Sequence, residues 1–428
     1  MAKLSEASLD DVCLLVTDGT HDTPKRVKDG FPLIKAKEIG GEKIDFETCD
    51  QISGEEHLRV IARSKPEYGD TLFAHIGASL GEAAFVKTHR PFSIKNIALF
   101  KPNLKIIDER YLYYLVISPA FQGLAKQIKT GSAQPFLSLG HLRSHRITYH
   151  EALNEQRKIA AILSAYDDLI ENNLRRIKIL EEMAQNLYRE WFVKFRFPGH
   201  QQARFTNSPL GLIPEGWEVS VLGEHLIALE SGKRPKGGAK DLAFGIPSVG
   251  AENIFGIGRH KYQSEKYVSR EFFKGMRQGV VKDGDVALYK DGAYIGRSAY
   301  FRDSFPHAQF CVNEHVFLLR TTGKRLTQNI LYLWLQETDT VSGIRATNAN
   351  AAQPGINQKG VNGVSLIVPP LDIAGRFDQL AEPSLALIVS LAKRNEALRR
   401  TRDLLLPRLI SGEVDVSELD IAVPEEVL

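Results

Sequence analysis

Residues 69–84 read GDTLFAHIGASLGEAA, and residues 284–299 read GDVALYKDGAYIGRSA. The two stretches share six residues at one constant shift, the 215 positions that separate Gly69 from Gly284. The shared residues are Gly69, Asp70, Gly77, Ala78, Gly81 and Ala84 in the first stretch, and Gly284, Asp285, Gly292, Ala293, Gly296 and Ala299 in the second. Chance matches between unrelated loops would not keep one order, so the sequence predicts a tandem duplication. Glycine is needed where a turn takes a positive φ, which makes these positions structural rather than contacts.

The duplication extends in both directions from these stretches. On the N-terminal side the same shift relates Pro32, Ala36 and Ile39 to Pro247, Ala251 and Ile254. On the C-terminal side Gln134 matches Gln353 at a shift of 219 positions, so a few inserted residues separate the copies. The repeated unit is therefore slightly longer than 200 residues.

Each copy gives its local signals in the same order. Alternating stretches at 71–76 and 286–290, bounded by turn residues, favour strands, and residues 109–117 and 328–336 favour helices. Long helical patterns without strand character follow at about 155–195 and 377–409. The predicted fold class is α+β, with two mixed α/β domains in tandem, each followed by a long helix. The expected boundaries are 1–150, 151–197, 198–370 and 371–415, with a tail at 416–428.

The two long helices are predicted to pair as an antiparallel coiled coil. In the first helix Leu163, Ile170 and Ile177 are seven residues apart, and Asn173 and Leu180 belong to the interleaved set. The alternative, one face of a globular helix, would show a wider stripe with a period of 3.6 residues. In the register where paired numbers add to 568, the pairs are Leu163 with Leu405, Ile170 with Leu398, Ile177 with Leu391, Leu180 with Ile388, and Asn173 with Asn395.

Composition narrows the function without deciding it. The net charge of +3 and the pI near 8.5 permit nucleic-acid binding through local patches. No secretion leader and no apolar run long enough for a membrane are found, so a cytoplasmic protein without a membrane partner is expected. The chain shows no Walker A loop, no amino-methyltransferase motif and no paired-histidine helix motif. We therefore expect no catalytic residues, no metal site and no cofactor in this chain.

Four segments resemble the DNA-specificity subunits of type I restriction-modification systems. The resemblance covers nearly the whole chain and rests on residues 9–24 and 209–219 at the start of each copy, on Glu155, Gln156, Arg157 and Ile159, and on residues 406–413. The second helix departs from the pattern, because residues 373–377 read IAGRF where the first helix has Glu-Gln-Arg. Contacts made by that segment are therefore less certain to follow the family.

The resemblance implies a non-catalytic subunit that determines which DNA sequence is bound and acts as a scaffold for the other subunits. Each domain would read one half of an asymmetric bipartite site in double-stranded DNA, and the helices would set the spacer. Two methyltransferase subunits would bring S-adenosylmethionine and methylate adenine at N6, after flipping it out of the duplex. Restriction subunits using ATP and Mg²⁺ would complete the assembly. Two alternatives stay open, a stand-alone architectural or regulatory DNA-binding protein with a dimerisation coiled coil, and a nuclease with an undetected carboxylate site.

Loops that combine cations with amide or hydroxyl side chains are the candidates for reading DNA. In the first domain they are Thr20, His21, Lys25, Arg26, Lys35, His75, Ser79, Lys129, Thr130, Ser132 and Gln134. In the second domain they are Lys233, Arg234, Lys236, Lys290, Tyr294, Arg297, Asn348, Asn350 and Gln353. Any single lysine or arginine here could instead be a solvated surface charge, so the clusters carry the prediction.

Overall fold

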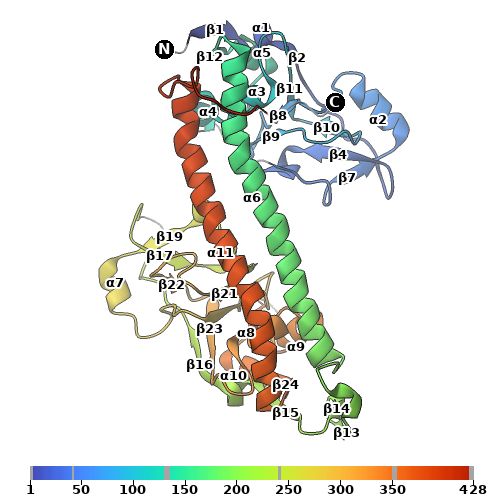
Figure 1. The fold of residues 1–428 in the computed structure, drawn as a ribbon, viewed down its shortest axis with the longest axis vertical. Helices are drawn as coiled ribbons and strands as arrows, with labels where there is room; N and C mark the ends of the chain where they lie inside the picture. Colours follow the sequence, from blue (N-terminus) through green and yellow to red (C-terminus); the bar gives the residue numbers. More distant parts are fainter. Residues whose placement is uncertain (1–2, 41–42, 130–134, 240–241, 349–353, 424–428) are drawn as a thin grey trace. The chain divides into compact units, whose positions relative to one another are not determined.

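The computed structural model describes residues 3–40, 43–129, 135–239, 242–348 and 354–423 (Figure 1). The chain divides into two compact units, each described by itself below. Unit 1 comprises Met1–Leu169 and Leu398–Leu428, and unit 2 comprises Ile170–Ala397. Helix α6 (Leu153–Tyr188) begins in unit 1 and ends in unit 2, whereas helix α11 (Leu371–Ile410) begins in unit 2 and ends in unit 1. None of the described helices is long and apolar enough to cross a membrane.

Unit 1 contains two four-stranded sheets and two short pairs of strands. The first sheet has the order β2 (Cys13–Asp18), β11 (Ala98–Pro102), β8 (Thr71–Phe73), β9 (Ala83–Phe85). The second has the order β10 (Ser93–Lys95), β4 (Phe31–Lys35), β7 (Asp50–Ile52), β3 (Arg26–Val27). Two short pairs complete the strands, β1 (Leu4–Ser8) with β12 (Arg146–His150) and β5 (Ile39–Gly40) with β6 (Lys43–Ile44).

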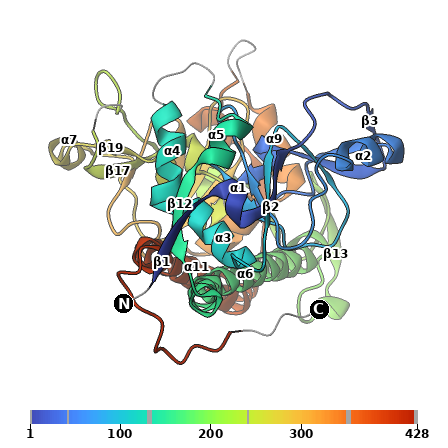
Figure 2. The ribbon, with the colours of Figure 1, turned by 90° about the horizontal axis from the view of Figure 1, so that it is seen from above.

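The shorter helices of unit 1 pack on both sheets, and residues 54–61 lie against β10 of the second sheet. They are α1 (Leu9–Val12), α2 (Gly54–Ile61), α3 (Glu109–Ile117), α4 (Pro119–Lys129) and α5 (Leu139–Ser144). Both α1 and α5 lie against β2 (Figure 2). The aromatic run Tyr111, Tyr113 and Tyr114 of α3 is buried in the core that also contains residues of α1 and α5.

Unit 2 repeats this arrangement. Its larger sheet has the order β16 (Leu226–Ser231), β23 (Val316–Thr321), β20 (Asp285–Tyr289), β21 (Ser298–Phe301), β18 (Gly256–Ile257). Its smaller sheet has the order β19 (Lys266–Val268), β17 (Ile246–Val249), β22 (Cys311–Val312). Further pairs are β15 (Glu218–Val221) with β24 (Ser365–Val368), and β13 (Phe205–Ser208) with β14 (Gly211–Pro214). The helices are α7 (Arg270–Lys274), α8 (Gln328–Trp334), α9 (Thr338–Ala346) and α10 (Gln358–Asn362).

The repeated glycines have the same backbone geometry in both units. Gly77 and Gly292 have φ of 77° and 91°, and Gly81 and Gly296 have φ of 94° and 89°. Residues other than glycine rarely adopt this left-handed backbone conformation, so each hairpin depends on its glycines. Their structural interpretation is confirmed, and so is the fold class of two tandem mixed domains with long helices.

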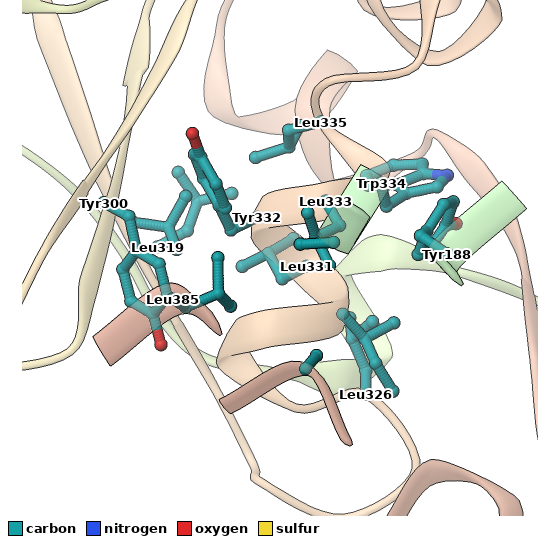
Figure 3. Packing of buried hydrophobic residues seen from close by; sticks show 14 of the residues in the cluster. Tyr188, Tyr300, Leu319, Leu326, Leu331, Tyr332, Leu333, Trp334, Leu335 and Leu385 are labelled. Atoms are coloured by element: carbon teal, nitrogen blue, oxygen red, sulfur yellow. The ribbon is translucent and has the colours of Figure 1, made fainter. Parts of the chain in front are cut away.

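Helix α8 fills the core of unit 2. In Figure 3 its residues 331–334 pack among Leu319 of β23, Tyr300 of β21, Tyr188 of α6 and Leu385 of α11. The Tyr332 hydroxyl accepts a hydrogen bond from the Ile257 backbone N–H at 3.1 Å, which satisfies a phenol buried among apolar groups. The domain core and the helix pair in this unit are thus one continuous apolar cluster.

Helices α6 and α11 run antiparallel within each unit (Figure 1). In unit 2 the Asn173 amide donates a 2.8 Å hydrogen bond to Asn395 Oδ1, with both side chains buried. In unit 1 Arg402 pairs with Asp167, and the Lys158 ammonium donates to the Ser417 carbonyl at 2.7 Å. Ser417 follows the end of α11, and in unit 1 the partner number rises from Arg402 to Ser417 as the α6 number falls from Asp167 to Lys158, as antiparallel pairing requires.

The heptad residues divide into a buried set and a half-buried set. Leu163, Ile170, Ile177, Ile388 and Leu391 are buried, whereas the half-buried residues are Leu180, Leu398 and Leu405. At the end of α11 the neighbour Leu406 is buried instead of Leu405. A straight α-helix drifts by about 20° per heptad, and at this end the helix packs on the core of unit 1.

Candidate nucleic-acid interface

In both units a glycine leads from a strand, β2 in unit 1 and β16 in unit 2, into a cationic loop. A Cβ on Gly19 would lie 2.1 Å from the Ile94 carbonyl oxygen, and one on Gly232 would lie 1.8 Å from the Val312 carbonyl oxygen. Only glycine allows so close a crossing of β10 in unit 1 and of β22 in unit 2. We call the segments that follow, residues 20–26 and 233–239, the crossing loops. They begin at the same place in the two folds and differ in side chains.

The crossing loop of unit 1 is held by a buried carboxylate. Asp18, whose side chain is 3% exposed, lies 3.0 Å from His21 Nε2 and also pairs with Arg63. The other ring nitrogen of His21 lies 2.9 Å from Asn96 Oδ1. The His21 ring is thereby fixed in orientation although more than half of it faces solvent. Thr20 is half-buried, and Lys25 is exposed.

Arg26 and Lys35 share one acidic partner. Arg26 Nε lies 3.0 Å from Asp50 Oδ2, and the Lys35 ammonium pairs with the same oxygen. The hydrogen bond from Lys35 holds the pKa of Asp50 below its ordinary value. Lys35 is one-fifth exposed and Arg26 about two-thirds exposed, so Arg26 offers the more accessible charge of the two.

His75 does not fit the prediction that it contacts DNA. Its side chain has no exposed surface, and Nδ1 lies 2.8 Å from the Leu137 carbonyl oxygen, so Nδ1 carries the proton. Burial lowers the pKa of His75, which keeps the ring neutral. The Nε2 atom has no hydrogen-bond partner in the described part of the chain. His75 therefore joins the glycine hairpin to the segment at 135–137, and Ser79 on that hairpin is half-buried.

The glycine hairpin and the segment before α5 or α10 meet in the same way in both units. The Gly77 N–H donates to the Pro135 carbonyl at 2.9 Å, and the Gly292 N–H donates to the Pro354 carbonyl at 2.9 Å. Two loops chosen from the sequence as DNA-reading candidates are therefore adjacent in each unit. Other candidates, Thr130, Ser132, Gln134, Asn350 and Gln353, lie outside the described residues, as does the side chain of Lys129, the last residue of α4.

The crossing loop of unit 2 forms one wall of a cleft of about 610 Å³. Charged residues line it from several elements, namely Arg234, Lys236, Glu252, Lys266, Glu314 and His315. Arg234 Nε lies 2.9 Å from Glu314 Oε1, which holds the guanidinium at the rim. Lys233 and Lys236 are exposed. The cleft therefore offers accessible cations above an acidic floor that positions them.

The glycine hairpin of unit 2 carries an exposed stacked pair. The Arg297 guanidinium lies 3.7 Å from the centre of the Tyr294 ring, and both side chains are exposed. Lys290 is half-buried with its ammonium 5.0 Å from the Phe317 ring centre. Asn348 Oδ1 accepts a hydrogen bond from the Gly355 N–H at 2.9 Å, which closes the neighbouring loop. Arg297 and Tyr294 are thus the most accessible candidates on this hairpin.

His315 connects the cleft to the hairpin. Its Nδ1 lies 3.1 Å from Asp291 Oδ2, and its Nε2 lies 3.5 Å from Glu314. The sequence analysis missed His315 and Lys266, and also Asp18 as the residue that orients His21. The acidic anchors could have been found only by pairing the repeats strand by strand, because single acidic residues in loops carry no distinctive pattern.

Comparison with known proteins gives consistent matches. Residues 5–182 match the family described as type I restriction modification DNA specificity domain. The MjaIX type I restriction enzyme specificity subunit of Methanocaldococcus jannaschii is 26% identical over 323 residues, covering 74% of this chain and 72% of the relative. The MjaVIII specificity subunit of that organism is 24% identical over 361 residues, covering 82% and 80%. A type I restriction-modification S subunit from M. genitalium shares the fold, with a TM-score of 0.56, 13% identity and 96% of both chains covered.

Proposed function

The chain belongs to the family of type I restriction-modification DNA specificity subunits, and on that premise we propose that each unit reads one half of a bipartite DNA site. The observation that carries the proposal is the paired construction of the two interfaces. In both units a glycine crossing and a glycine hairpin keep the same backbone path while the side chains on them differ. Two different half-sites would require the same backbone scaffold in both units with different side chains on it.

The accessible cations divide into two roles. Lys25 and Arg26 in unit 1, with Lys233 and Lys236 in unit 2, are exposed charges suited to phosphates. His21 and Arg297 are held by neighbouring side chains, and a fixed orientation is what reading a base edge needs. We assign the four exposed cations of the crossing loops to positioning on the duplex, and His21 and Arg297 to sequence readout.

The chemistry of methylation and cleavage belongs, in this proposal, to partner subunits. S-adenosylmethionine would be bound by two methyltransferase subunits, and ATP and Mg²⁺ by restriction subunits. The helices offer an apolar face for docking, because Ile179 and Met183 on α6 are 55% and 56% exposed and lie one turn apart. A methyltransferase contact there would cover apolar side chains that water now contacts.

The test is a map of N6-methyladenine in the host genome, with the gene intact and deleted. Loss of one gapped, bipartite motif on deletion is the expected result, and it would also define both half-sites. An unchanged map, with the methyltransferase expressed and active, would overturn the proposal in favour of an architectural DNA-binding protein. Magnesium-dependent cutting by the isolated chain would overturn the assignment of chemistry to partners.

The two half-sites can then be assigned to the two units with purified complexes. We expect Arg297→Ala to relax or weaken recognition in one half-site, at a cost of about 1–3 kcal/mol if Arg297 contacts a base. Lys324→Ala is the matched control in unit 2. Lys324 is exposed beyond Thr321 at the end of β23, and Thr321 pairs with Leu226 at the opposite end of β16 from Ser231 and the crossing loop.

A further inference from the structure

Two histidines and a glutamate converge in the smaller lobe of unit 2, which is the part built around its smaller sheet. His260 follows β18, Glu265 directly precedes β19, and His307 precedes β22. Their ligand atoms lie within 4.8 Å of one another, the one such group of three or more His, Cys, Asp or Glu side chains found in the described ranges. Two separate segments of the lobe, the β18–β19 connection and the segment before β22, therefore bring nitrogen and oxygen donors to one point.

Both imidazoles direct Nε2 at the same carboxylate oxygen. His260 Nε2 lies 2.5 Å from Glu265 Oε1, and His307 Nε2 also contacts that oxygen. The second oxygen, Oε2, accepts a hydrogen bond from the Tyr267 hydroxyl at 2.9 Å. The Tyr262 ring packs edge-on against both imidazoles, with centroids 4.7 Å and 5.7 Å away. The donors are thus oriented by an outer layer of contacts, as metal ligands usually are.

Two of the three residues are shielded from solvent. The His260 side chain has no exposed surface and that of Glu265 is 6% exposed, whereas His307 is one-quarter exposed. The Nδ1 atom of His260 is buried and has no hydrogen-bond partner among the described residues. Zinc coordinates neutral imidazole and ionised carboxylate, so zinc binding at this point would release any additional proton that the group holds.

We propose that His260, Glu265 and His307 form a structural Zn²⁺ site that ties the β18–β19 segment to the segment before β22. Two imidazole nitrogens and a carboxylate are ordinary zinc ligands, and a water would take the fourth tetrahedral position. Tetrahedral bonds of about 2.0–2.2 Å place ligand atoms roughly 3.3–3.6 Å apart. The carboxylate would have to withdraw from each imidazole by about 1 Å, which is within the reach of one side-chain rotation.

The corresponding place in unit 1 is apolar. The shift that relates Ile52 in β7 to Val268 in β19 relates Phe46 to Tyr262, and Phe46 packs edge-on against Phe92 with ring centroids 5.3 Å apart. An aromatic contact closes that lobe in unit 1. In unit 2 the proposed zinc site would hold the corresponding segments together by metal coordination.

The chain offers a direct test because Trp191, Trp217 and Trp334, its three tryptophans, are all buried in the core of unit 2. The full chain is freed of metal with a chelator and titrated calorimetrically with Zn²⁺ alone, and urea unfolding is followed by tryptophan fluorescence with and without Zn²⁺. We expect one Zn²⁺ bound per chain and a higher urea midpoint at saturating Zn²⁺, because a ligand that binds only the folded state stabilises it. Mg²⁺ should produce neither effect, since it prefers oxygen ligands.

Variants locate the site. His307→Ala, which changes the most exposed of the three ligands, should weaken zinc binding by about tenfold or more and abolish the midpoint shift. Glu265→Gln, which keeps the size of the side chain, should do the same if His307→Ala disturbs the fold. His315→Ala is the matched control, because His315 also lies between two carboxylates in unit 2. Zinc binding that is absent in the wild type, retained in both ligand variants, or lost in His315→Ala would overturn the proposal.

Discussion

Replacing Asn173 with leucine tests the pairing of the two long helices. Asn173 and Asn395 are 9% and 1% exposed, and the hydrogen bond between them is 2.8 Å long. The Asn395 Nδ2 atom already lacks a partner among the described residues. In Asn173→Leu the Asn395 amide would lose the partner of its oxygen as well, and a buried polar group left in this state costs about 1–3 kcal/mol.

The leucine also brings apolar burial, so the informative quantity is the coupling between the two positions. Each single variant, Asn173→Leu or Asn395→Leu, leaves one buried amide without its hydrogen-bond partner. The double variant removes both amides, so it leaves none unpaired in this way. We therefore expect the double variant to be more stable than the sum of the single effects predicts, by about 1–3 kcal/mol. Asn172→Leu is the control for helix propensity, because Asn172 is exposed on the next position of α6.

Tryptophan fluorescence during urea unfolding is the assay, because all three tryptophans and both asparagines belong to unit 2. The signal then reports one unit, which avoids assigning a single free energy to a chain of two units. An additive cycle, with a coupling below about 0.5 kcal/mol, would refute the reasoning. So would an Asn173→Leu variant as stable as Asn172→Leu.

Three further predictions concern unit 2 and can be measured in the same way or by DNA binding. Gly232→Ala should destabilise unit 2 by about 1–3 kcal/mol, because the added Cβ would lie too close to a backbone oxygen. Gly343→Ala is the control, since a Cβ on this residue of α9 would meet open space and should not destabilise the unit. Equal stability of the two variants would contradict the crossing geometry. Lys236→Ala should reduce the dependence of log K for DNA on log salt by about 0.9, if Lys236 contacts one phosphate, and Lys324→Ala should leave the slope unchanged. The hydrogen bond from Arg302 holds the pKa of Glu382 below its usual 4.5, so the pair stabilises the fold above that pH and the benefit is lost as pH falls through the lowered value. The urea midpoints of wild type and Glu382→Gln should accordingly differ most near neutral pH and converge in acid, and a constant difference would count against this pair.

The repeat was predictable because glycine has few substitutes where φ is positive. Gly77 and Gly292 therefore survive in both copies, and they report a backbone conformation rather than a side-chain contact. The heptad was predictable for the same kind of reason, since only a sustained seven-residue spacing keeps one face of a long helix in contact with its partner. Where α11 packs on the core of unit 1 the rule weakens, and Leu406 is buried in place of Leu405.

The burial of individual candidate DNA-contacting residues was less predictable, because position in a repeat does not determine burial. His75 and Lys290 are 215 positions apart and occupy equivalent places before their hairpins, yet His75 is fully buried and Lys290 is half-exposed. The Nδ1 atom of His75 lies 2.8 Å from the Leu137 carbonyl oxygen, whereas the Lys290 ammonium lies 5.0 Å from the Phe317 ring centre. These partners lie far away in the sequence, so a linear pattern does not reveal them.

The proposed reading of two half-sites by one fold would use this difference between a fixed backbone and variable side chains. The path of each crossing loop is set by the contact of Gly19 with β10, or of Gly232 with β22, before any loop side chain is reached. Substitutions in residues 20–26 or 233–239 can therefore change charge and hydrogen bonding without moving the sheet beneath them. The acidic anchors limit this freedom, because removing Asp18 would leave His21 and Arg63 without their shared partner. Recognition can thus change fastest where a side chain is exposed and unanchored, as at Lys25, and slowest where it is anchored, as at His21.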